Sequence, residues 1–180
     1  DQLAKTECIL NICLSRADIN PGPMMFIQPT LSMAEAFSKD RIATTIRDTP
    51  RLRKIFGDEK SRNSGSTILH KPFIDGHLTI TGANSPSSFV SRPIRDVYGD
   101  EFDQWVMDLG GQGDPGKIIS KRTATFKDRL LAFTSTPTIK DFSKIEKRFK
   151  QSDQRYRHVK CPHCGKYQKL NFKNVKWDKD

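Results

Sequence analysis

The stretch Val97-Tyr98-Gly99-Asp100-Glu101-Phe102-Asp103 decides the fold class of this chain. It reads as an apolar strand that delivers two neighbouring carboxylates, Asp100 and Glu101, at its end. In open parallel sheets, ligands bind beyond the carboxyl ends of the strands. Asp100 is therefore a candidate to hold Mg²⁺ through the water shell of the ion, and Glu101 is a candidate to polarise an attacking water. Taken alone, the pattern fits equally well with two surface acids that follow a strand.

A second informative stretch is Ala4-Lys5-Thr6, which opens a predicted helix. A phosphate-binding loop needs backbone N–H groups at a helix N-terminus, a lysine that reaches the β- and γ-phosphates, and a Ser or Thr hydroxyl for Mg²⁺. Lys5 and Thr6 fit the last two roles. The full pattern G-x-x-x-x-G-K-S/T is not present, because its first glycine would precede residue 1 and Ala4 replaces the second. A Lys-Thr pair that simply opens a helix is the alternative.

The third stretch, Leu130-Leu131-Ala132-Phe133-Thr134-Ser135-Thr136-Pro137, is a predicted buried strand that ends in small hydroxyl residues. In motor ATPases a strand of this kind lies beside the acidic strand and senses the γ-phosphate, which makes Ser135 and Thr136 candidate coupling residues. An ordinary strand followed by a turn would give the same pattern. The three stretches occur in the order typical of nucleotide-triggered motors, and this shared order predicts a P-loop NTPase more strongly than each stretch does alone.

Predicted helices and strands alternate along the chain, which is typical of a mainly parallel α/β sheet flanked by helices. The apolar spacing predicts helices over 5–18, 32–46, 50–55, 117–126 and 141–152, strands over 24–27, 77–81, 95–98, 129–133 and 155–160, and loops over 57–72, 82–86 and 110–116. The continuous apolar run 24–27 predicts a strand buried on both faces. We expect a P-loop core over 1–153 that lacks its first strand, and a small CxxC element over 154–180.

The net charge of +10 favours a polyanionic partner such as nucleic acid, although a solvated basic surface is the alternative. The basic residues concentrate late in the sequence, which directs the DNA-binding hypothesis to the C-terminal third: Lys140, Lys144, Lys147, Arg148, Lys150, Arg155, Arg157 and Lys160. No stretch approaches the roughly 20 apolar residues that span a bilayer, and no signal peptide is recognisable. We therefore expect no membrane partner.

The four cysteines fall into two groups. Cys8 and Cys13 lie in an apolar helical pattern and are predicted to be buried thiols. Cys161-Pro162-His163-Cys164-Gly165 is a CxxC turn, and two thiolates at this spacing supply half of a structural zinc site of the zinc-ribbon kind. No later cysteine completes the set, so a redox-active or metal-free pair remains the alternative for Cys161 and Cys164.

These motifs together resemble the large terminase subunits of the lambda type, which package phage DNA. Gln2-Leu3-Ala4-Lys5-Thr6-Glu7 resembles the Q-x-G-K-T-E form of the phosphate loop in that family. Gly82-Ala83-Asn84-Ser85-Pro86, Ser91-Arg92-Pro93 and Asp100-Glu101-Phe102-Asp103 are similar to its G-A-N-S-P, S-R-P and D-E-x-D run. Later blocks complete the order: Gly113-Asp114-Pro115, Lys121-Arg122-Thr123, Ser135-Thr136-Pro137-Thr138, Ser152-Asp153-Gln154-Arg155 and Cys161-Pro162-His163-Cys164-Gly165.

The resemblance implies an ATP-driven motor that moves double-stranded DNA into a procapsid. It implies a homo-oligomer that works with the small terminase subunit and the portal in the cytoplasm of a phage-infected or prophage-carrying bacterium. A C-terminal endonuclease is expected of the intact protein, outside this chain, so no cleavage residues are assigned.

The resemblance also assigns roles to individual residues. ATP and Mg²⁺ contacts are implied for Gln2, Ala4, Lys5, Thr6 and Asp100. Glu101 and Asp100 would carry catalysis, and Ser135 and Thr136 would couple hydrolysis to movement. Arg92 and Arg122 are both candidates for an arginine finger. The sequence departs from the family pattern in two ways: Ala4 replaces a glycine and restricts a loop that needs an unhindered backbone, and the strand expected before the phosphate loop is missing.

Two other functions fit the same residues. A helicase-like DNA translocase also uses Asp-Glu-x-Asp and Ser-Thr-Pro motifs, and a second domain of the same fold further along the chain would favour it. A non-enzymatic DNA-binding module, with a degenerate nucleotide site at Ala4, would rely on the basic C-terminal third and the CxxC turn.

Overall fold

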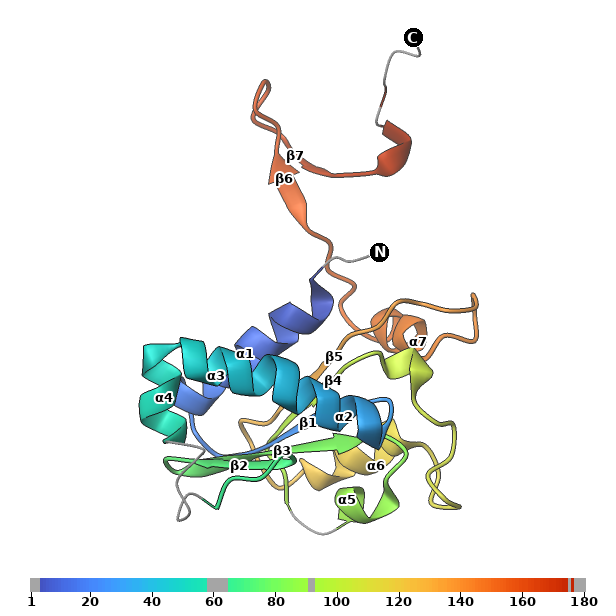
Figure 1. The fold of residues 1–180 in the computed structure, drawn as a ribbon. Helices are drawn as coiled ribbons and strands as arrows, with labels where there is room; N and C mark the ends of the chain where they lie inside the picture. The colour runs from blue at the N-terminus through green and yellow to red at the C-terminus, as the bar shows by residue number, and fades with distance from the viewer. Residues whose placement is uncertain (1–3, 58–64, 91–92, 175, 177–180) are drawn as a thin grey trace.

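A five-stranded sheet forms the centre of the computed structural model, which describes residues 4–57, 65–90, 93–174 and 176 (Figure 1). The strand order is β2-β3-β1-β4-β5, and every neighbouring pair is parallel except β2 and β3. The strands are β1 (Pro23–Gln28), β2 (His70–Phe73), β3 (Gly76–Gly82), β4 (Asp96–Gly99) and β5 (Leu130–Phe133). The predicted mainly parallel α/β sheet is therefore confirmed.

Helices cover both faces of the sheet, as Figure 1 shows. On one face lie α1 (Lys5–Ile19), α2 (Leu31–Phe37), the π-helical turn η1 (Ser38–Ile42), α3 (Ala43–Asp48) and α4 (Pro50–Phe56). On the other face lie α5 (Pro86–Val90), the 3-10 turn η2 (Phe102–Gln104), α6 (Pro115–Arg122) and α7 (Lys144–Lys150). The helix predicted over 32–46 corresponds to α2, η1 and α3, which follow one another without a break.

Strand β1 separates two hydrophobic cores. Met24 and Phe26 pack into the core beneath α1 to α4, whereas Met25 and Ile27 pack into the core on the α6 face. Side chains alternate between the faces of a strand, so a central strand covered on both sides must be apolar at every position. The strand prediction for 24–27 is confirmed for this reason.

The loop predicted over 57–72 is wrong at its end. Residues His70 to Phe73 form β2, an edge strand that pairs antiparallel with β3. Pro72 in the middle of this stretch weakened the strand signal, yet proline is tolerated in an edge strand because only one side of the strand needs a complete ladder. The predicted burial of Cys8 is also wrong, because Cys8 is exposed, whereas Cys13 is buried.

Helix starts differ from the predictions where side chains cap them. Helix α6 begins inside the predicted 110–116 loop, because Asp114 accepts a hydrogen bond from the N–H of Lys117 (3.0 Å) and Pro115 occupies the first turn. Helix α7 begins later than predicted, because the Ser143 hydroxyl accepts from the N–H of Glu146 (3.1 Å) and fixes the start there. Helix α5 occupies a region for which no helix was predicted.

A buried charge network anchors the start of β4. Asp96 is fully buried and accepts hydrogen bonds from Arg16 Nε (2.9 Å) and Arg95 Nη2 (2.8 Å). The side chain of Arg95 is 7% exposed and also donates to the carbonyl of Pro21 (2.9 Å). The network joins the end of α1 to the amino end of β4, opposite the edge of the sheet where β4 delivers Asp100.

Beyond α7 the chain forms a small antiparallel hairpin of β6 (His158–Lys160) and β7 (Tyr167–Lys169), followed by the 3-10 turn η3 (Phe172–Asn174). Figure 1 shows this hairpin extending away from the five-stranded sheet. The strand predicted over 155–160 is confirmed only for its second half. Among the described residues, no helix combines the length and the apolar character needed to cross a membrane.

Candidate active site

Four hydrogen-bond donors from different parts of the fold converge on Asp100, which is 3% exposed. Thr6 Oγ1, in the first turn of α1, donates to Asp100 Oδ2 (2.8 Å), and Gln28 Nε2, at the end of β1, donates to the same oxygen (3.2 Å). Thr134 Oγ1, directly after β5, and the N–H of Glu101 donate to Asp100 Oδ1 (2.9 Å and 3.1 Å). The structure therefore brings the three predicted stretches together at the carboxyl edge of the sheet.

Lys5 and Glu101 face each other beside this cluster. Their charged groups lie 3.9 Å apart, and each side chain is 25% exposed. Lys5 Nζ also donates to Thr136 Oγ1, and the N–H of Thr136 points at Glu101 Oε2 (3.5 Å). A partly exposed ammonium beside a partly exposed carboxylate is accessible to an entering ligand, unlike the buried Asp100.

The backbone at Ala4 explains why a glycine is expected there. Ala4 has φ 54° and ψ 26°, in the left-handed region that glycine adopts without steric cost, and it immediately precedes the first residue of α1. Its carbonyl accepts the N–H of Cys8 (2.9 Å). The alanine thus adopts a backbone conformation that favours glycine, and it carries the strain of its Cβ there. The nearby Gln2 lies outside the described residues.

Ser135 and Thr136 contact different partners. Ser135 Oγ accepts the N–H of Asp103 (3.0 Å), so it binds the turn that follows Glu101, whereas Thr136 binds Lys5. The hydroxyl that reaches Asp100 belongs to Thr134 instead. Both residues remain coupling candidates, because each links the end of β5 to another part of the site.

Sequence reasoning missed Gln28 and Thr134 as site residues. Each is the first polar residue after an apolar run, at the carboxyl edge of the sheet where Asp100 follows β4. That position was the available signal, because parallel strands in register bring their carboxyl ends together. Of the two arginine-finger candidates, Arg92 lies outside the described residues, and Arg122 lies in the last turn of α6. Within the described part of the chain, no hydrogen bond of Asp100 or Glu101 involves Arg122.

The CxxC turn joins β6 to β7 and has an ordered backbone. The N–H of Cys161 donates to the carbonyl of Lys166 (2.9 Å), and the N–H of Gly165, at φ 71°, donates to the carbonyl of Cys161 (3.0 Å). Backbone hydrogen bonds from Cys164 and His163 lower the pKa of the Cys161 thiol. Throughout residues 4–57, 65–90, 93–174 and 176, no group of three or more His, Cys, Asp or Glu side chains could hold a metal ion. In this part of the chain the turn therefore brings together two thiols but no set of three metal-binding side chains.

The basic residues of the C-terminal third divide into two sets. Lys144 donates to the carbonyl of Val106 (3.0 Å), and the guanidinium of Arg148 lies over the ring of Phe133 (4.2 Å to the centroid), so both point at the core. The exposed members of the set include Lys140, Lys147, Arg157 and Lys160. An electrostatic surface for a polyanion would therefore consist of the second set.

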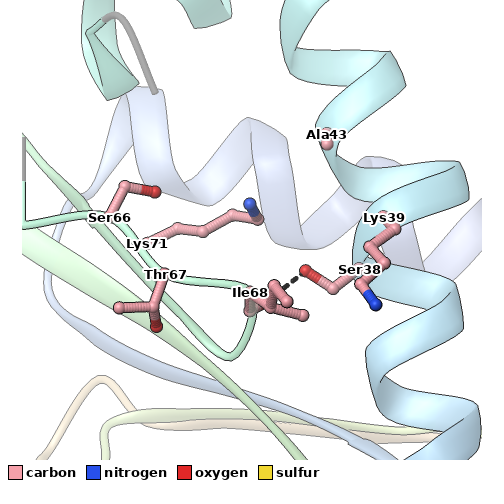
Figure 2. Close-up of a pocket in the computed structure, with 7 residues that line it drawn as sticks. All are labelled: Ser38, Lys39, Ala43, Ser66, Thr67, Ile68 and Lys71. Atoms are coloured by element: carbon pink, nitrogen blue, oxygen red, sulfur yellow. Dashed lines mark hydrogen bonds between the residues drawn. The ribbon is translucent and has the colours of Figure 1, made fainter. Parts of the chain in front are cut away.

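A separate cavity of about 280 Å³ lies between η1 and the segment before β2 (Figure 2). The Ser38 hydroxyl donates to the carbonyl of Ile68 across it, and Figure 2 shows the side chain of Lys71 extending into this space. Its lining consists of Ser38, Lys39, Ala43, Ser66, Thr67, Ile68 and Lys71. None of the predicted site residues belongs to this lining, so the cavity is distinct from the Asp100 cluster.

Comparison with known proteins shows the family to which this chain belongs. A family model described as "Phage terminase large subunit gpA, ATPase domain" matches residues 1–180. The large terminase subunit of Enterobacteria phage P21 is 29% identical over 164 residues, which cover 87% of this chain and 26% of that protein. The large terminase subunit of Escherichia phage lambda is 29% identical over 161 residues, which cover 84% of this chain and 25% of that protein. The chain thus spans about a quarter of the length of these relatives.

Solved structures share the fold. The large terminase ATPase domain of Thermus phage P74-26 aligns with a TM-score of 0.56 at 13% identity, covering 94% of this chain and 68% of that chain. An arginine-to-alanine variant of that domain gives a TM-score of 0.58 at 14% identity, covering 94% and 69%. At such low identity the likeness supports the α/β architecture alone. The family match across the full sequence is decisive: the chain belongs to the phage terminase large subunit gpA family, of the lambda type, and represents its ATPase domain.

Proposed function

We propose that this chain is the ATP-hydrolysing motor domain of a terminase large subunit, and that it couples hydrolysis to translocation of double-stranded DNA into a procapsid. The observation that carries the proposal is the 2.8 Å hydrogen bond between Thr6 Oγ1 and Asp100 Oδ2. It joins the helix start that would hold phosphate to the strand end that would hold Mg²⁺, although 94 residues separate the two in sequence.

The donor set fits ATP and Mg²⁺. The Thr6 hydroxyl and the Asp100 carboxylate are the hard oxygen ligands that Mg²⁺ prefers, directly or through water. Mg²⁺, when bound, neutralises charge on the phosphate oxygens. Lys5 at the start of α1 would bind the β- and γ-phosphates, with the backbone of residues 4–6 and, outside the described residues, Gln2 completing the loop.

Glu101 is proposed as the residue that orients and polarises the attacking water. Its carboxylate lies next to Lys5 rather than in the buried cluster, so it borders the space where the γ-phosphate would lie. Ser135 and Thr136 are proposed as coupling residues. Lys5, Glu101 and Thr136 contact one another, and a γ-phosphate bound by Lys5 would compete with the Thr136 contact. The end of β5 would in this way respond to the nucleotide.

Double-stranded DNA is the proposed polymer. Lys140, Lys147, Arg157 and Lys160 give the C-terminal third an exposed basic surface, and phosphate contacts of this kind dominate DNA affinity. Alanine at these four positions should lower DNA affinity and flatten its dependence on salt, since fewer counterions are released. An unchanged salt slope would move the DNA site elsewhere.

The intact protein is proposed to work with the small terminase subunit and the portal of the procapsid, as a homo-oligomer in the cytoplasm of the bacterial host. We also propose that an endonuclease domain accompanies the motor domain outside this chain. Cys161 and Cys164 are proposed as one half of a zinc site, because a turn that lowers the pKa of a thiol favours the thiolate that zinc binds. The remaining ligands would come from outside the described residues.

ATP turnover by the full-length protein, with and without double-stranded DNA, tests the motor function. Lys5→Ala should lose nucleotide binding and turnover together, whereas Glu101→Gln should keep binding and lose turnover. Glu7→Gln is the matched control, because Glu7 lies in the same first turn of α1 but pairs with Arg41 (2.6 Å). Turnover that survives in Glu101→Gln would remove this residue from its role. No turnover in the parent protein, with salt-dependent DNA binding intact, would favour a DNA-binding module with a degenerate nucleotide site.

A further inference from the structure

Helix α7 is fastened to the turn that follows Glu101 by its own cations. The Arg148 guanidinium lies over the neighbouring rings of Phe102 and Phe133, 4.9 Å and 4.2 Å from their centroids, and donates to the carbonyl of Gly116 (3.2 Å). Lys144 Nζ donates to the carbonyls at the end of the same turn. Both side chains are half-buried, and burial lowers the pKa of each. These two cations are therefore used to dock α7.

A single carboxylate, Asp103, joins three segments at this contact. Its Oδ1 accepts the N–H of Ile145 in α7 (2.8 Å). Its Oδ2 accepts both the N–H (3.0 Å) and the hydroxyl (3.1 Å) of Thr138, in the segment after β5. Its own N–H donates to Ser135 Oγ (3.0 Å). The side chain thus links the turn after Glu101, the segment 134–138 and the first turn of α7.

The protonation state of Asp103 fits this use. Burial of the carboxyl opposes ionisation, but hydrogen bonds from Ser143, Ile145 and Thr138 outweigh it and hold the pKa of Asp103 below its usual value. A carboxylate that accepts several hydrogen bonds is more tightly held than a neutral acceptor, because bonds to an ionised group are shorter and stronger. The lowered pKa therefore keeps Asp103 ionised at neutral pH.

We propose that Asp103 is a positioning residue that fastens α7 to the Glu101 turn, so that nucleotide-dependent changes at Glu101 and Thr136 reach the basic C-terminal segment through α7. The inference rests on the proposed function, since it requires that nucleotide binds at Lys5 and that DNA binds the C-terminal segment. Asp103 lies only two residues from Glu101, and α7 leads directly into residues 151–160 and the β6–β7 hairpin. A displacement of the turn after Glu101 would therefore move the first turn of α7. Because α7 is short, its other end and the basic residues that follow it would move as well.

The test is Asp103→Asn in the full-length protein. Asparagine keeps the size of the side chain but places an NH₂ group against the donors of Ile145 or Thr138. Asp108→Asn is the matched control, because Asp108 also accepts two backbone N–H groups, from Gly111 (2.5 Å) and Gly113 (2.7 Å), but lies outside the contact with α7. Affinity for a fluorescent ATP analogue, turnover without DNA and turnover with double-stranded DNA would be measured for each.

We expect Asp103→Asn to keep nucleotide affinity and DNA-free turnover, and to lower the stimulation of turnover by DNA roughly ten-fold, which corresponds to the loss of about one charged hydrogen bond. Asp108→Asn should behave like the parent. Hydrogen exchange of residues 138–150, with and without the ATP analogue, supplies the second readout: nucleotide should change protection there in the parent but not in Asp103→Asn.

The outcomes distinguish a failure of the positioning role of Asp103 from a failure of the proposed motor function. DNA-stimulated turnover that Asp103→Asn leaves intact overturns the positioning role while the proposed function stands. Loss of nucleotide affinity and DNA-free turnover in Asp103→Asn also overturns it, because Asp103 would then support the nucleotide site itself. No turnover in the parent protein refutes the proposed function and, with it, this inference.

Discussion

Replacing Asp96 by asparagine tests the buried network at the start of β4. Asp96 has no exposed surface and serves two guanidiniums, of which Arg95 is 7% exposed and Arg16 is 25% exposed. Breaking a buried ion pair by removing one partner costs about 3–5 kcal/mol, because the other charge stays buried without compensation. Asparagine retains one acceptor oxygen, and Arg95 keeps its hydrogen bond to the carbonyl of Pro21. We therefore expect a loss near the lower limit, about 3 kcal/mol.

Urea unfolding followed by circular dichroism measures this loss. With an m value of about 2 kcal/mol/M, the midpoint of Asp96→Asn should fall by about 1.5 M. Asp128→Asn is the control, because Asp128 lies 3.7 Å from the same Arg95 but its side chain is 57% exposed, and exposed pairs contribute little. If both variants unfold at the same urea concentration, the network contributes no more than a surface pair and the reasoning is refuted.

Three further predictions follow from backbone geometry and thiol chemistry. Ala4→Gly should raise the free energy of unfolding by about 0.5–1 kcal/mol, because the relief of left-handed strain exceeds the added freedom of the unfolded chain; urea unfolding that shows a loss would contradict it. Gly82→Ala should lower the free energy of unfolding by about 3 kcal/mol or more, since the added Cβ would lie 2.2 Å from the N atom of Leu31. A urea midpoint equal to that of the parent would exclude this clash. Cys161 should react with iodoacetamide with an apparent pKa below that of a free thiol, while Cys13, whose pKa burial raises, stays unmodified in the native protein; equal rates would refute both assignments.

The sequence predicted the central part of the fold well, for physical reasons. The run 24–27 had to be buried on both faces, and the apolar strand before Asp100 had to place this carboxylate at the carboxyl edge of a parallel sheet. These are properties of periodicity and strand polarity, which depend on few neighbours. The positions of Lys5 beside Glu101 and of Thr6 beside Asp100 agree with the predicted site, whereas their roles in binding phosphate and Mg²⁺ stay predictions.

The remaining site residues depended on contacts that local patterns do not encode. Gln28 and Thr134 reach Asp100 only because β1, β4 and β5 are neighbours in register, an order that the sequence does not state. The strand at His70–Phe73 contains a proline, and it is stabilised by its pairing with β3 and by the packing of Phe73 against Phe56, which are not local in sequence. The contact of Asp103 with α7 arises in the same way, from the packing of segments about 40 residues apart.

The alternation of side chains along β1 has a consequence for unfolding. Phe26 and Ile27 are neighbours in this strand but belong to opposite cores. If one helical layer separated from the sheet, it would expose one apolar face of β1. The other layer would then pack against a strand that has lost half of its support. The two layers should therefore melt in a single cooperative transition, with coincident curves from probes placed in each. Thr6 belongs to one helical layer and Thr134 directly follows β5, the neighbour of β4, so the hydrogen bonds around Asp100 should be present in every native molecule and lost together on unfolding.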